Sequence, residues 1–355
     1  MTGRVLLYGA TGYTGREVAA ALAGRVDLVL AGRDPERVRA IAEPLGVAWQ
    51  AFDCGPVAAM ASRLAGTTLV LNAAGPFDLT APMLADGCIA VGAHYLDLGG
   101  EWPVFLEIMR RDEAARAAGV MLLPGVGLTI AATDCLLKRA VERWPDTARL
   151  CLGISRAQVI SRGSVASAAR LLSPATMIRR NGELVAVPAG SLTRAFDFGG
   201  GLSEATAMSW ADVVTGGFTT GVPDIEVYSE LRWSERASMR ASGLAMGWSG
   251  PGPARVLAGA AARFWPAEPP PATRAAARFT MVVEAHDPWR RVRRLCLRTL
   301  DGYGASVLSA AEAVRRVLAG TAQPGFQTPA RVFGSGFMVE AGAAAFATDD
   351  AREAA

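Results

Sequence analysis

Short apolar runs alternate with amphipathic stretches along the first 125 residues of the chain. Each run has the length of a strand, and a glycine or a polar residue follows it closely, which is typical of buried parallel strands. The stretches between the runs repeat apolar residues at helical spacing. The pattern predicts strands at 4–9, 27–31, 47–52, 68–73, 94–98 and 120–124, and helices at 14–23, 35–43, 56–65, 81–91 and 103–118. This alternation predicts an α/β fold, with an N-terminal Rossmann domain built on a doubly wound parallel sheet.

The alternation is lost beyond residue 125, where longer and less regular segments follow. Two runs near the C-terminus alternate polar and apolar residues on either side of Asp287-Pro288, which predicts an antiparallel hairpin with one face in solvent. We expect a helix at 131–144, a strand at 148–155, hairpin strands at 278–286 and 292–300, a helix at 305–319 and an extended segment at 320–355. The second region is therefore expected to be a separate α+β domain.

A glycine-rich loop lies between the first predicted strand and the first predicted helix. Its spacing, G-x-x-G-x-x-G, is a variant of the dinucleotide-binding motif, in which glycines allow a tight turn and a close approach of the backbone to a pyrophosphate. The N-terminus of the following helix favours the negative charge of the phosphates. The alternative is a glycine-rich turn that binds nothing. The candidate cofactor-binding residues of this loop are Gly9, Thr11, Gly12, Tyr13, Thr14 and Gly15.

The end of the second predicted strand indicates which dinucleotide would bind. NAD-binding domains usually place an acidic residue there, where it binds the ribose 2′-hydroxyl. Here the strand ends in Ala31-Gly32-Arg33, and a guanidinium suits a 2′-phosphate. The sequence therefore favours NADP over NAD. The alternative is that Asp34 binds the ribose 2′-hydroxyl of NAD.

Two further loops are expected at the same edge of the sheet, because ligands of this fold bind outside the carboxyl ends of the strands. The loop after the fourth strand would run along the nicotinamide ribose, with the alternative of a plain strand–helix connection. Its candidate residues are Asn72, Ala74, Gly75, Pro76 and Phe77.

Tyr95 and Asp97 lie on one face of the fifth predicted strand, since side chains alternate along a strand. A phenol and a carboxyl at that edge are candidates to donate or accept a proton. The alternative is that Asp97 or Glu101 caps the helix that begins near Trp102.

Composition excludes several classes of function. Hydrophobic residues make up 51% of the chain and charged residues 19%, so disorder is not expected as its main state. A formal charge of +3 gives no indication of nucleic-acid binding. With His94 and His286 as the two histidines and Lys138 as the single lysine, a three-histidine zinc site is excluded, lysine-dependent chemistry has one candidate, and no metal is expected.

Cysteine spacing and two apolar stretches bear on localisation. The five cysteines form no C-x-x-C pair and no signal peptide is visible, which indicates a reducing, cytoplasmic setting. Residues 117–133 carry no charge, but they contain Pro124 and are too short for a membrane span, so a buried strand and helix start are expected. Residues 241–265 are rich in Gly, Ala and Trp, and the alternatives are a peripheral membrane contact and a mobile part of a soluble domain.

Six segments spread along the chain together resemble the saccharopine dehydrogenase-like oxidoreductases: GATGYTGREVA, AGR, NAAGPF, AHYLDLGGE, DGYGASVLSAAEA and TPA. The chain is most similar to the bacterial branch that includes trans-acting enoyl reductases. The resemblance implies a Rossmann domain over 1–125, an inserted α+β substrate domain over 126–300, and a C-terminal part, 301–355, that returns to the first domain. It also implies hydride transfer with NAD or NADP and places Tyr95, Asp97 and Glu101 in the family's motif.

One segment departs from the family's pattern. Many relatives have Gly-Phe-Asp and then Pro-Ser-Asp after the sixth strand, whereas this chain has Gly127-Leu128-Thr129 and Ala132-Thr133-Asp134. Only the second acid is kept, as Asp134, which joins Tyr95 and Asp97 as a candidate catalytic residue. The missing acid puts the family's activity in doubt.

Three functions stay open at this point. The first is a reductase that transfers hydride from NADPH to a polarised C=C, C=O or C=N bond of a small or acyl-type substrate, with the cofactor supplying the chemistry. The second is a relative of the short-chain dehydrogenases, although none of the five tyrosines is followed four residues later by lysine. The third is a non-catalytic NADP-binding sensor or scaffold. The sequence also leaves a homo-oligomer open.

Overall fold

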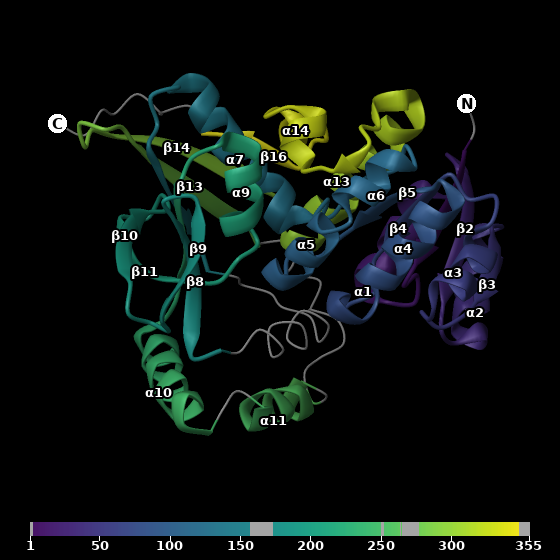
Figure 1. Ribbon diagram of the computed structural model, residues 1–355, viewed down its shortest axis with the longest axis horizontal. Helices are drawn as coiled ribbons and strands as arrows, with labels where there is room; N and C mark the ends of the chain where they lie inside the picture. Colours follow the sequence, from purple (N-terminus) through teal and green to yellow (C-terminus); the bar gives the residue numbers. More distant parts are fainter. Residues whose placement is uncertain (1–2, 157–172, 250–251, 263, 265–276, 348–355) are drawn as a thin grey trace. The chain divides into compact units, whose positions relative to one another are not determined.

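The computed structural model describes residues 3–156, 173–249, 252–262, 264 and 277–347 of the chain (Figure 1). It divides into two compact units, unit 1 with Met1–Ala131 and Tyr303–Phe337, and unit 2 with Ala132–Gly302 and Met338–Ala355. The expected boundary at 125/126 thus lies at 131/132. We expected the whole of 301–355 to return to the first domain, but residues 338–347 group with unit 2, because residues 344–346 pair with a strand of that unit.

Unit 1 contains a seven-stranded sheet in the order β15-β6-β5-β4-β1-β2-β3, and every neighbouring pair is parallel. Its strands are β1 (Arg4–Tyr8), β2 (Asp27–Gly32), β3 (Ala48–Ala51), β4 (Leu69–Asn72), β5 (His94–Asp97), β6 (Met121–Leu123) and β15 (Gly325–Phe326). The order 3-2-1-4-5-6 is that of a Rossmann domain. The predicted Rossmann fold is therefore confirmed, with one strand more than the six that the apolar runs predicted.

Up to residue 117, the helices of unit 1 connect the strands β1 to β6, as parallel pairs require, and the later helices flank β15. They are α1 (Tyr13–Leu22), α2 (Pro35–Leu45), α3 (Val57–Leu64), η1 (Phe77–Leu79), α4 (Ala81–Val91), α5 (Trp102–Met109), α6 (Asp112–Ala117), α13 (Gly302–Arg316), η2 (Val317–Thr321) and α14 (Pro329–Phe333). Helix α2 begins and ends at residues that favour helix termini. Asp34 caps its N-terminus, Pro35 fills its first position, and Gly46 ends it in a left-handed conformation.

Two expectations about these segments were wrong. The single helix expected at 103–118 is two helices, α5 and α6. Arg111, at the break, binds Asp86 at 2.6 Å, and Asp112 accepts a hydrogen bond from the Phe326 backbone, so tertiary contacts divide an uninterrupted apolar pattern. The segment 320–355 is not extended throughout, since its described part holds β15, α14, α15 (Phe337–Glu340) and β16 (Ala344–Phe346).

Unit 2 is built on a mixed sheet of nine strands within the described residues. Besides β16, they are β7 (Arg149–Ile154), β8 (Ala175–Arg180), β9 (Glu183–Pro188), β10 (Thr193–Asp197), β11 (Leu202–Ala207), β12 (Asp224–Glu230), β13 (Phe279–His286) and β14 (Val292–Thr299). Its helices are α7 (Leu128–Arg143), which starts in unit 1, α9 (Asp212–Thr220), α10 (Trp233–Ser249) and α11 (Gly252–Ala262). The predicted hairpin is confirmed, because β13 pairs with β14 from Phe279↔Thr299 to His286↔Val292.

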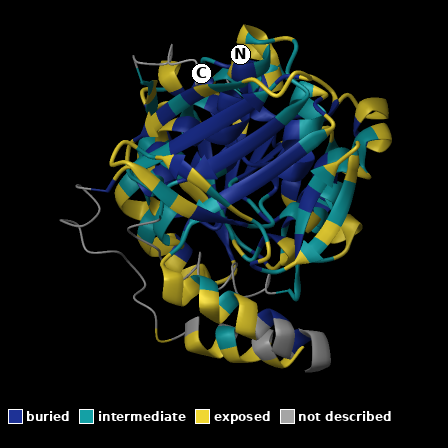
Figure 2. Ribbon diagram, turned by 90° about the vertical axis from the view of Figure 1, so that its left-hand side faces the viewer, coloured by how far each residue is buried: buried dark blue, intermediate teal, exposed yellow. Residues whose placement is uncertain are grey.

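Buried side chains cover both faces of the central strands of this sheet, and Figure 2 colours these strands as buried. Cys151, Tyr228 and Val282 belong to a buried cluster on one face. Leu152, Val227 and Val283 are buried on the other. Phe196 packs over Gly153, where any Cβ would meet the ring at 2.6 Å.

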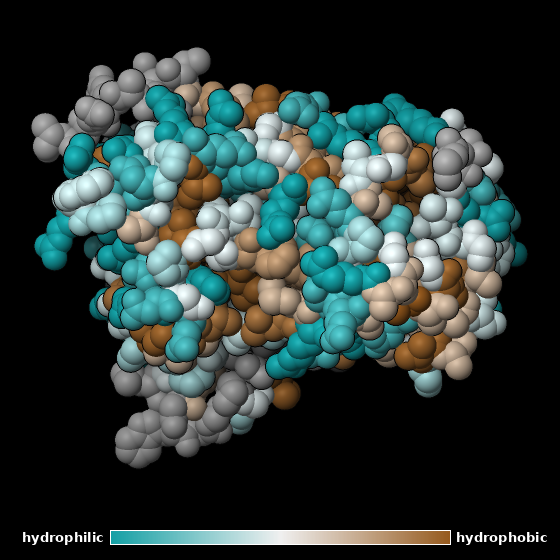
Figure 3. Space-filling model, turned by 45° about the horizontal axis from the view of Figure 1, so that its top comes forward, coloured by the Kyte–Doolittle hydropathy of each residue, from teal (hydrophilic) through white to brown (hydrophobic). Residues whose placement is uncertain are grey.

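The arginine run of β14 does not form the single solvent face that we expected, because Arg293 and Arg294 are adjacent and point to opposite faces. Arg293 pairs with Asp146 at 2.7 Å and Arg294 with Glu284 at 2.8 Å. On the face drawn in Figure 3, hydrophilic and hydrophobic residues are interspersed. In the described part of the chain, no helix is both long and apolar enough to cross a membrane.

Candidate cofactor site

The predicted cofactor residues of unit 1 lie at one edge of its parallel sheet. They belong to loops that follow β1, β2 and β4, which are neighbours in the sheet, and the segment from Asp97 to Glu101 follows β5 beside them. Because the carboxyl ends of parallel strands lie together, these loops form one rim. We call it the carboxyl rim, and it consists of residues 9–15, 33, 72–77 and 97–101.

The three glycines of the first loop have different reasons to be glycine. Gly9 has a φ of +89°, and a Cβ there would lie 2.6 Å from the Ala74 nitrogen. A Cβ at Gly15 would overlap the carbonyl oxygen of Gly9. Gly12 is different, because a Cβ would come no closer than 3.4 Å to the Gly9 oxygen, and φ is −74°. The protein's own packing therefore requires Gly9 and Gly15 but leaves room for a methyl group at Gly12, which is exposed.

Helix α1 begins immediately after Gly12, and no side chain caps its N-terminus. An uncapped helix start presents backbone N–H groups and the positive end of the helix dipole, which together favour a phosphate. Tyr13 packs edge-on against Tyr303 of α13, with ring centroids 5.0 Å apart. The loop is thus supported by a segment almost 300 residues later in the sequence, a contact that the sequence did not predict.

Asn72 holds the loop after β4 in place. Its Oδ1 accepts a hydrogen bond from the Ala74 nitrogen at 3.0 Å, and its Nδ2 donates to Thr80 Oγ1 at 2.9 Å. Thr80 Oγ1 in turn donates to the Ala74 carbonyl at 2.8 Å. Asn72 is fully buried, whereas Gly75, whose peptide bond to Pro76 is cis, is exposed. Asn72 therefore fixes the loop's shape. Thr80, which shares that task, was not predicted from the sequence.

Tyr95 and Asp97 lie on the same face of β5, as the alternation predicted, and Tyr95 Oη donates to Asp97 Oδ2 at 2.8 Å. The other carboxylate oxygen, Oδ1, accepts from the Gly99 nitrogen at 2.8 Å and the Gly125 nitrogen at 2.9 Å. Asn72 Nδ2 also donates to Tyr95 Oη, at 3.1 Å. Asp97 thus links the ends of β4, β5 and β6 through groups that are all buried.

Burial governs the ionisation of this pair. Loss of hydration raises the pKa of Asp97 to about 6, although its three hydrogen bonds favour the charged form. Burial, together with the nearby Asp97 carboxylate, raises the pKa of Tyr95 well above its ordinary value. At neutral pH the pair therefore consists of a neutral phenol and a largely ionised carboxylate.

Replacing Asp97 by asparagine tests this assignment through the pH dependence of stability. The folded-state pKa of about 6 lies above the ordinary value of 3.8, so Asp97 stabilises the fold most at low pH and loses this contribution as pH rises through 6. We expect the free energy of unfolding of the wild type, relative to Asp97→Asn, to fall by up to about 3 kcal/mol between about pH 4 and 7. Chemical denaturation at several pH values measures this difference, and parallel profiles for the two proteins would contradict it.

Glu101 does not cap α5 with its side chain, although it occupies the N-cap position. Its Oε2 accepts from the Gly100 nitrogen at 2.9 Å, while its Oε1 is buried and has no hydrogen-bond partner among the described residues. A buried carboxylate oxygen without a donor is costly, which is why such atoms are usually satisfied. Among the described residues, the rim therefore has a buried carboxylate oxygen that no donor binds.

Arg33 extends from the end of β2 with its side chain 80% exposed, and its Nε lies 4.0 Å from Asp53 Oδ1. The neighbouring Asp34 is engaged elsewhere, because its Oδ1 accepts from the Arg37 nitrogen at 3.1 Å as the cap of α2. Asp34, the candidate to bind the ribose hydroxyl of NAD, thus has a structural role as a helix cap. The exposed guanidinium of Arg33 is available to a ligand at this strand end.

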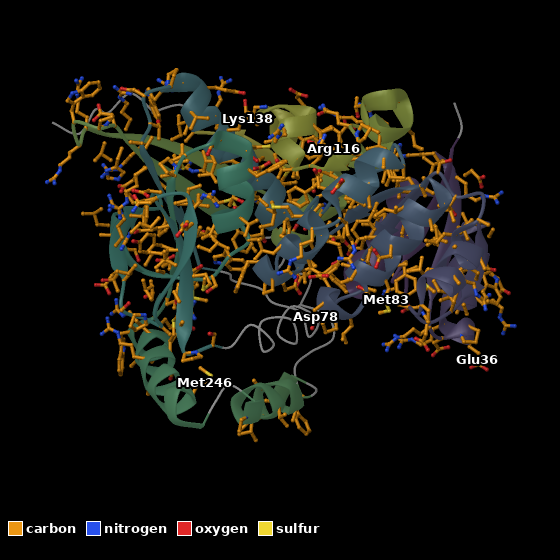
Figure 4. All side chains as sticks on the ribbon, viewed as in Figure 1. Glu36, Asp78, Met83, Arg116, Lys138 and Met246 are labelled. Carbon is orange, nitrogen blue, oxygen red and sulfur yellow. The ribbon has the colours of Figure 1, made fainter. Side chains whose placement is uncertain are left out.

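Asp134 lies on α7 in the part of the chain that belongs to unit 2, whereas Tyr95 and Asp97 belong to unit 1. It is fully buried, and Thr219 Oγ1 of α9 donates to its Oδ1 at 2.5 Å. Burial raises the pKa of the neighbouring Asp212 to about 7, and the charge of Asp134 adds to that shift. Lys138, labelled in Figure 4, lies on the same helix with its Nζ 4.0 Å from Glu142 Oε1.

A family model described as the saccharopine dehydrogenase NADP-binding domain matches residues 5–123. A trans-acting enoyl reductase of Mycobacterium ulcerans is 32% identical over 105 residues, which cover 27% of this chain and 25% of that protein. A saccharopine dehydrogenase-like oxidoreductase of Rattus norvegicus is 28% identical over 146 residues, or 35% of this chain and 34% of that protein. The matches confirm the resemblance that the motifs predicted, over a quarter to a third of each relative's length.

Among solved structures, the apo saccharopine dehydrogenase (L-Glu forming) of Saccharomyces cerevisiae matches with a TM-score of 0.64. The match covers 98% of this chain and 100% of the yeast chain, with 12% sequence identity. At that identity the likeness concerns the fold, which extends over both units.

Proposed function

We propose that this chain, whose residues 5–123 form a saccharopine dehydrogenase-type NADP-binding domain, is an NADPH-dependent oxidoreductase. In this proposal it reduces a polarised C=C, C=O or C=N bond of a small or acyl-type substrate. The observation that carries the proposal is Gly12, a glycine at the start of α1 that the protein's own packing does not require. A backbone that must approach a pyrophosphate closely explains it.

The residues of the carboxyl rim fit a dinucleotide along its length. The glycine loop and the start of α1 would hold the pyrophosphate, and the loop of Asn72, Ala74, Gly75, Pro76 and Phe77 would border the nicotinamide ribose. When bound, NADPH supplies a hydride from its nicotinamide ring. The unpartnered Oε1 of Glu101 would accept a hydrogen bond from an N–H or O–H group of the cofactor or the substrate.

Arg33 supports NADP as the preferred cofactor. Its exposed guanidinium can pair with a 2′-phosphate, and Asp34, the acid next to it, already caps α2. NAD would lack that pairing. We therefore assign NADP, with NAD as the weaker ligand.

Tyr95 and Asp97 act as positioning residues in this proposal, because their hydrogen bonds are made with other buried groups of the rim. They hold the ends of β4, β5 and β6 at fixed separations, which orients the loops around the nicotinamide. From the sequence, Tyr95 and Asp97 were candidates to donate or accept a proton, and Asp134 was a further candidate catalytic residue. Their burial supports an indirect role for the pair, and the role of Asp134 stays a prediction.

The name of the M. ulcerans relative supports C=C reduction as the first reaction to test. Purified full-length protein is incubated with NADPH carrying deuterium at nicotinamide C4 and with an enoyl thioester, an aldehyde, a ketone or an imine. We expect NADPH oxidation and deuterium in the product of one class. NADPH binding without oxidation by any class would instead favour a non-catalytic NADP sensor.

All five cysteines are free thiols, which supports a reducing compartment such as the cytoplasm. A small-molecule substrate follows from the proposed reaction, and a homo-oligomer is compatible with it. Size-exclusion chromatography with light scattering measures the oligomeric state directly.

A further inference from the structure

Two acidic side chains, Asp97 and Glu101, lie buried in the part of the carboxyl rim that follows β5. Asp97 is 1% exposed and Glu101 is 7% exposed. Gly99 lies close to both carboxyl groups, since a Cβ there would stand 3.1 Å from Asp97 Oδ1 and 3.5 Å from Glu101 Oε2. Burial and, to a smaller extent, the charge of Glu101 raise the pKa of Asp97, so the two groups affect each other. We call them the buried acidic pair.

Neutral groups make the hydrogen bonds of the buried acidic pair in the described part of the chain. Asp97 accepts from a phenol and two backbone nitrogens, and Glu101 Oε2 accepts from one backbone nitrogen. Glu101 Oε1 is buried and has no partner among the described residues. Buried carboxylates are usually paired with a cation or fully hydrogen-bonded. Within the described chain the pair is therefore left with negative charge that a cationic ligand group would balance.

The strand order places this pair in the nicotinamide half of the proposed cofactor site. A Rossmann sheet consists of two mononucleotide-binding halves, here β1 to β3 and β4 to β6. Arg33, assigned above to the 2′-phosphate of the adenosine, follows β2 in the first half, whereas Asp97 ends β5 in the second. Phe77, from the loop that would border the nicotinamide ribose, lies beside the pair, since a Cβ on Gly99 would stand 3.3 Å from its Cγ.

We propose that Asp97 and Glu101 stabilise the oxidised, positively charged nicotinamide ring more than the reduced, neutral ring, and thereby favour reduction of the substrate. This inference rests on the proposed function. The substrate receives the hydride with its electron pair and a proton from the medium, and the ring is left with one positive charge that nearby carboxylates attract. A buried site is screened much less by salt than an exposed one. Tighter binding of NADP⁺ than of NADPH shifts the equilibrium of hydride transfer on the protein towards the reduced substrate by the same factor.

Calorimetric titration of the full-length protein with NADP⁺ and with NADPH tests the inference. We expect the wild type to bind NADP⁺ at least about tenfold more tightly than NADPH. Glu101→Gln removes one charge and keeps an acceptor oxygen, so it should lower that preference at least about threefold. Equal affinity of the wild type for the two forms would overturn the inference, whether or not the variant folds, and so would an unchanged preference in a folded Glu101→Gln protein.

Arg33→Ala is the matched control, because it removes a charge from the other half of the site. Both forms of the cofactor carry the 2′-phosphate, so this variant should weaken NADP⁺ and NADPH by the same factor and leave their ratio unchanged. An equal change of the ratio in Arg33→Ala and in Glu101→Gln contradicts a specific effect of the buried acidic pair on the ring. Binding of neither form by the wild type would contradict the proposed function itself, whereas binding of both forms with equal affinity contradicts this inference alone.

Discussion

Valine at position 12 is expected to weaken NADPH binding more than about 100-fold while the chain still folds. A Cβ at Gly12 finds its nearest neighbour 3.4 Å away and the backbone is not in the left-handed region, so the free protein accommodates it. The branched side chain would instead stand where the pyrophosphate approaches α1. NADPH fluorescence titration measures the loss, and circular dichroism with thermal unfolding checks the fold.

Alanine at position 15 is the matched control, because it should lower the stability of the free protein, whereas valine at position 12 should lower only its affinity for NADPH. A Cβ there overlaps the carbonyl oxygen of Gly9, so Gly15→Ala should lower stability by several kcal/mol even without cofactor. If the Gly12→Val protein binds NADPH with wild-type affinity, the glycine loop is not part of the cofactor site. A Gly12→Val protein that is as unstable as Gly15→Ala would contradict the distinction between the two glycines.

Loss of the Arg33 guanidinium should change which cofactor the protein prefers. Arg33→Ala is expected to weaken NADPH binding roughly 10- to 100-fold, the range of a charge-assisted hydrogen bond or two to a phosphate, and to leave NADH binding nearly unchanged. Because the side chain is 80% exposed, its removal should cost little stability. The ratio of the NADPH and NADH dissociation constants reports the effect.

Arg39→Ala is the control for charge alone, since Arg39 is an exposed arginine of α2 that pairs with Glu43 along that helix. It should leave the ratio of the two dissociation constants unchanged. Equal weakening of NADPH and NADH by Arg33→Ala would show that Arg33 does not recognise the 2′-phosphate.

Much of unit 1 could be predicted because its signals are local. The apolar runs correspond to β1 to β6, and the glycine spacing and the Gly32-Arg33 strand end mark the rim by their chemistry. Strand β15 could not be predicted, because two residues, Gly325 and Phe326, carry no periodicity of their own and pair with β6 only in the folded chain. The pattern likewise reveals nothing about the break at Arg111.

The contacts within the site were harder to predict than its members. Alternation placed Tyr95 and Asp97 on one face, but the Gly125 nitrogen that also binds Asp97 lies 28 residues later and is brought there by the sheet. The same holds for Tyr303 against Tyr13. Glu101 was correctly placed at the start of α5, yet only the structure reveals that one of its oxygens has no donor in the described part of the chain.

The central claim is that unit 1 holds NADP, and calorimetric titration of the wild-type chain with NADPH and with NADH tests it most directly. We expect one NADPH per chain, bound at least about tenfold more tightly than NADH because of the pairing at Arg33. Binding of neither nucleotide, or equal affinity for both, would contradict the account of the carboxyl rim given above.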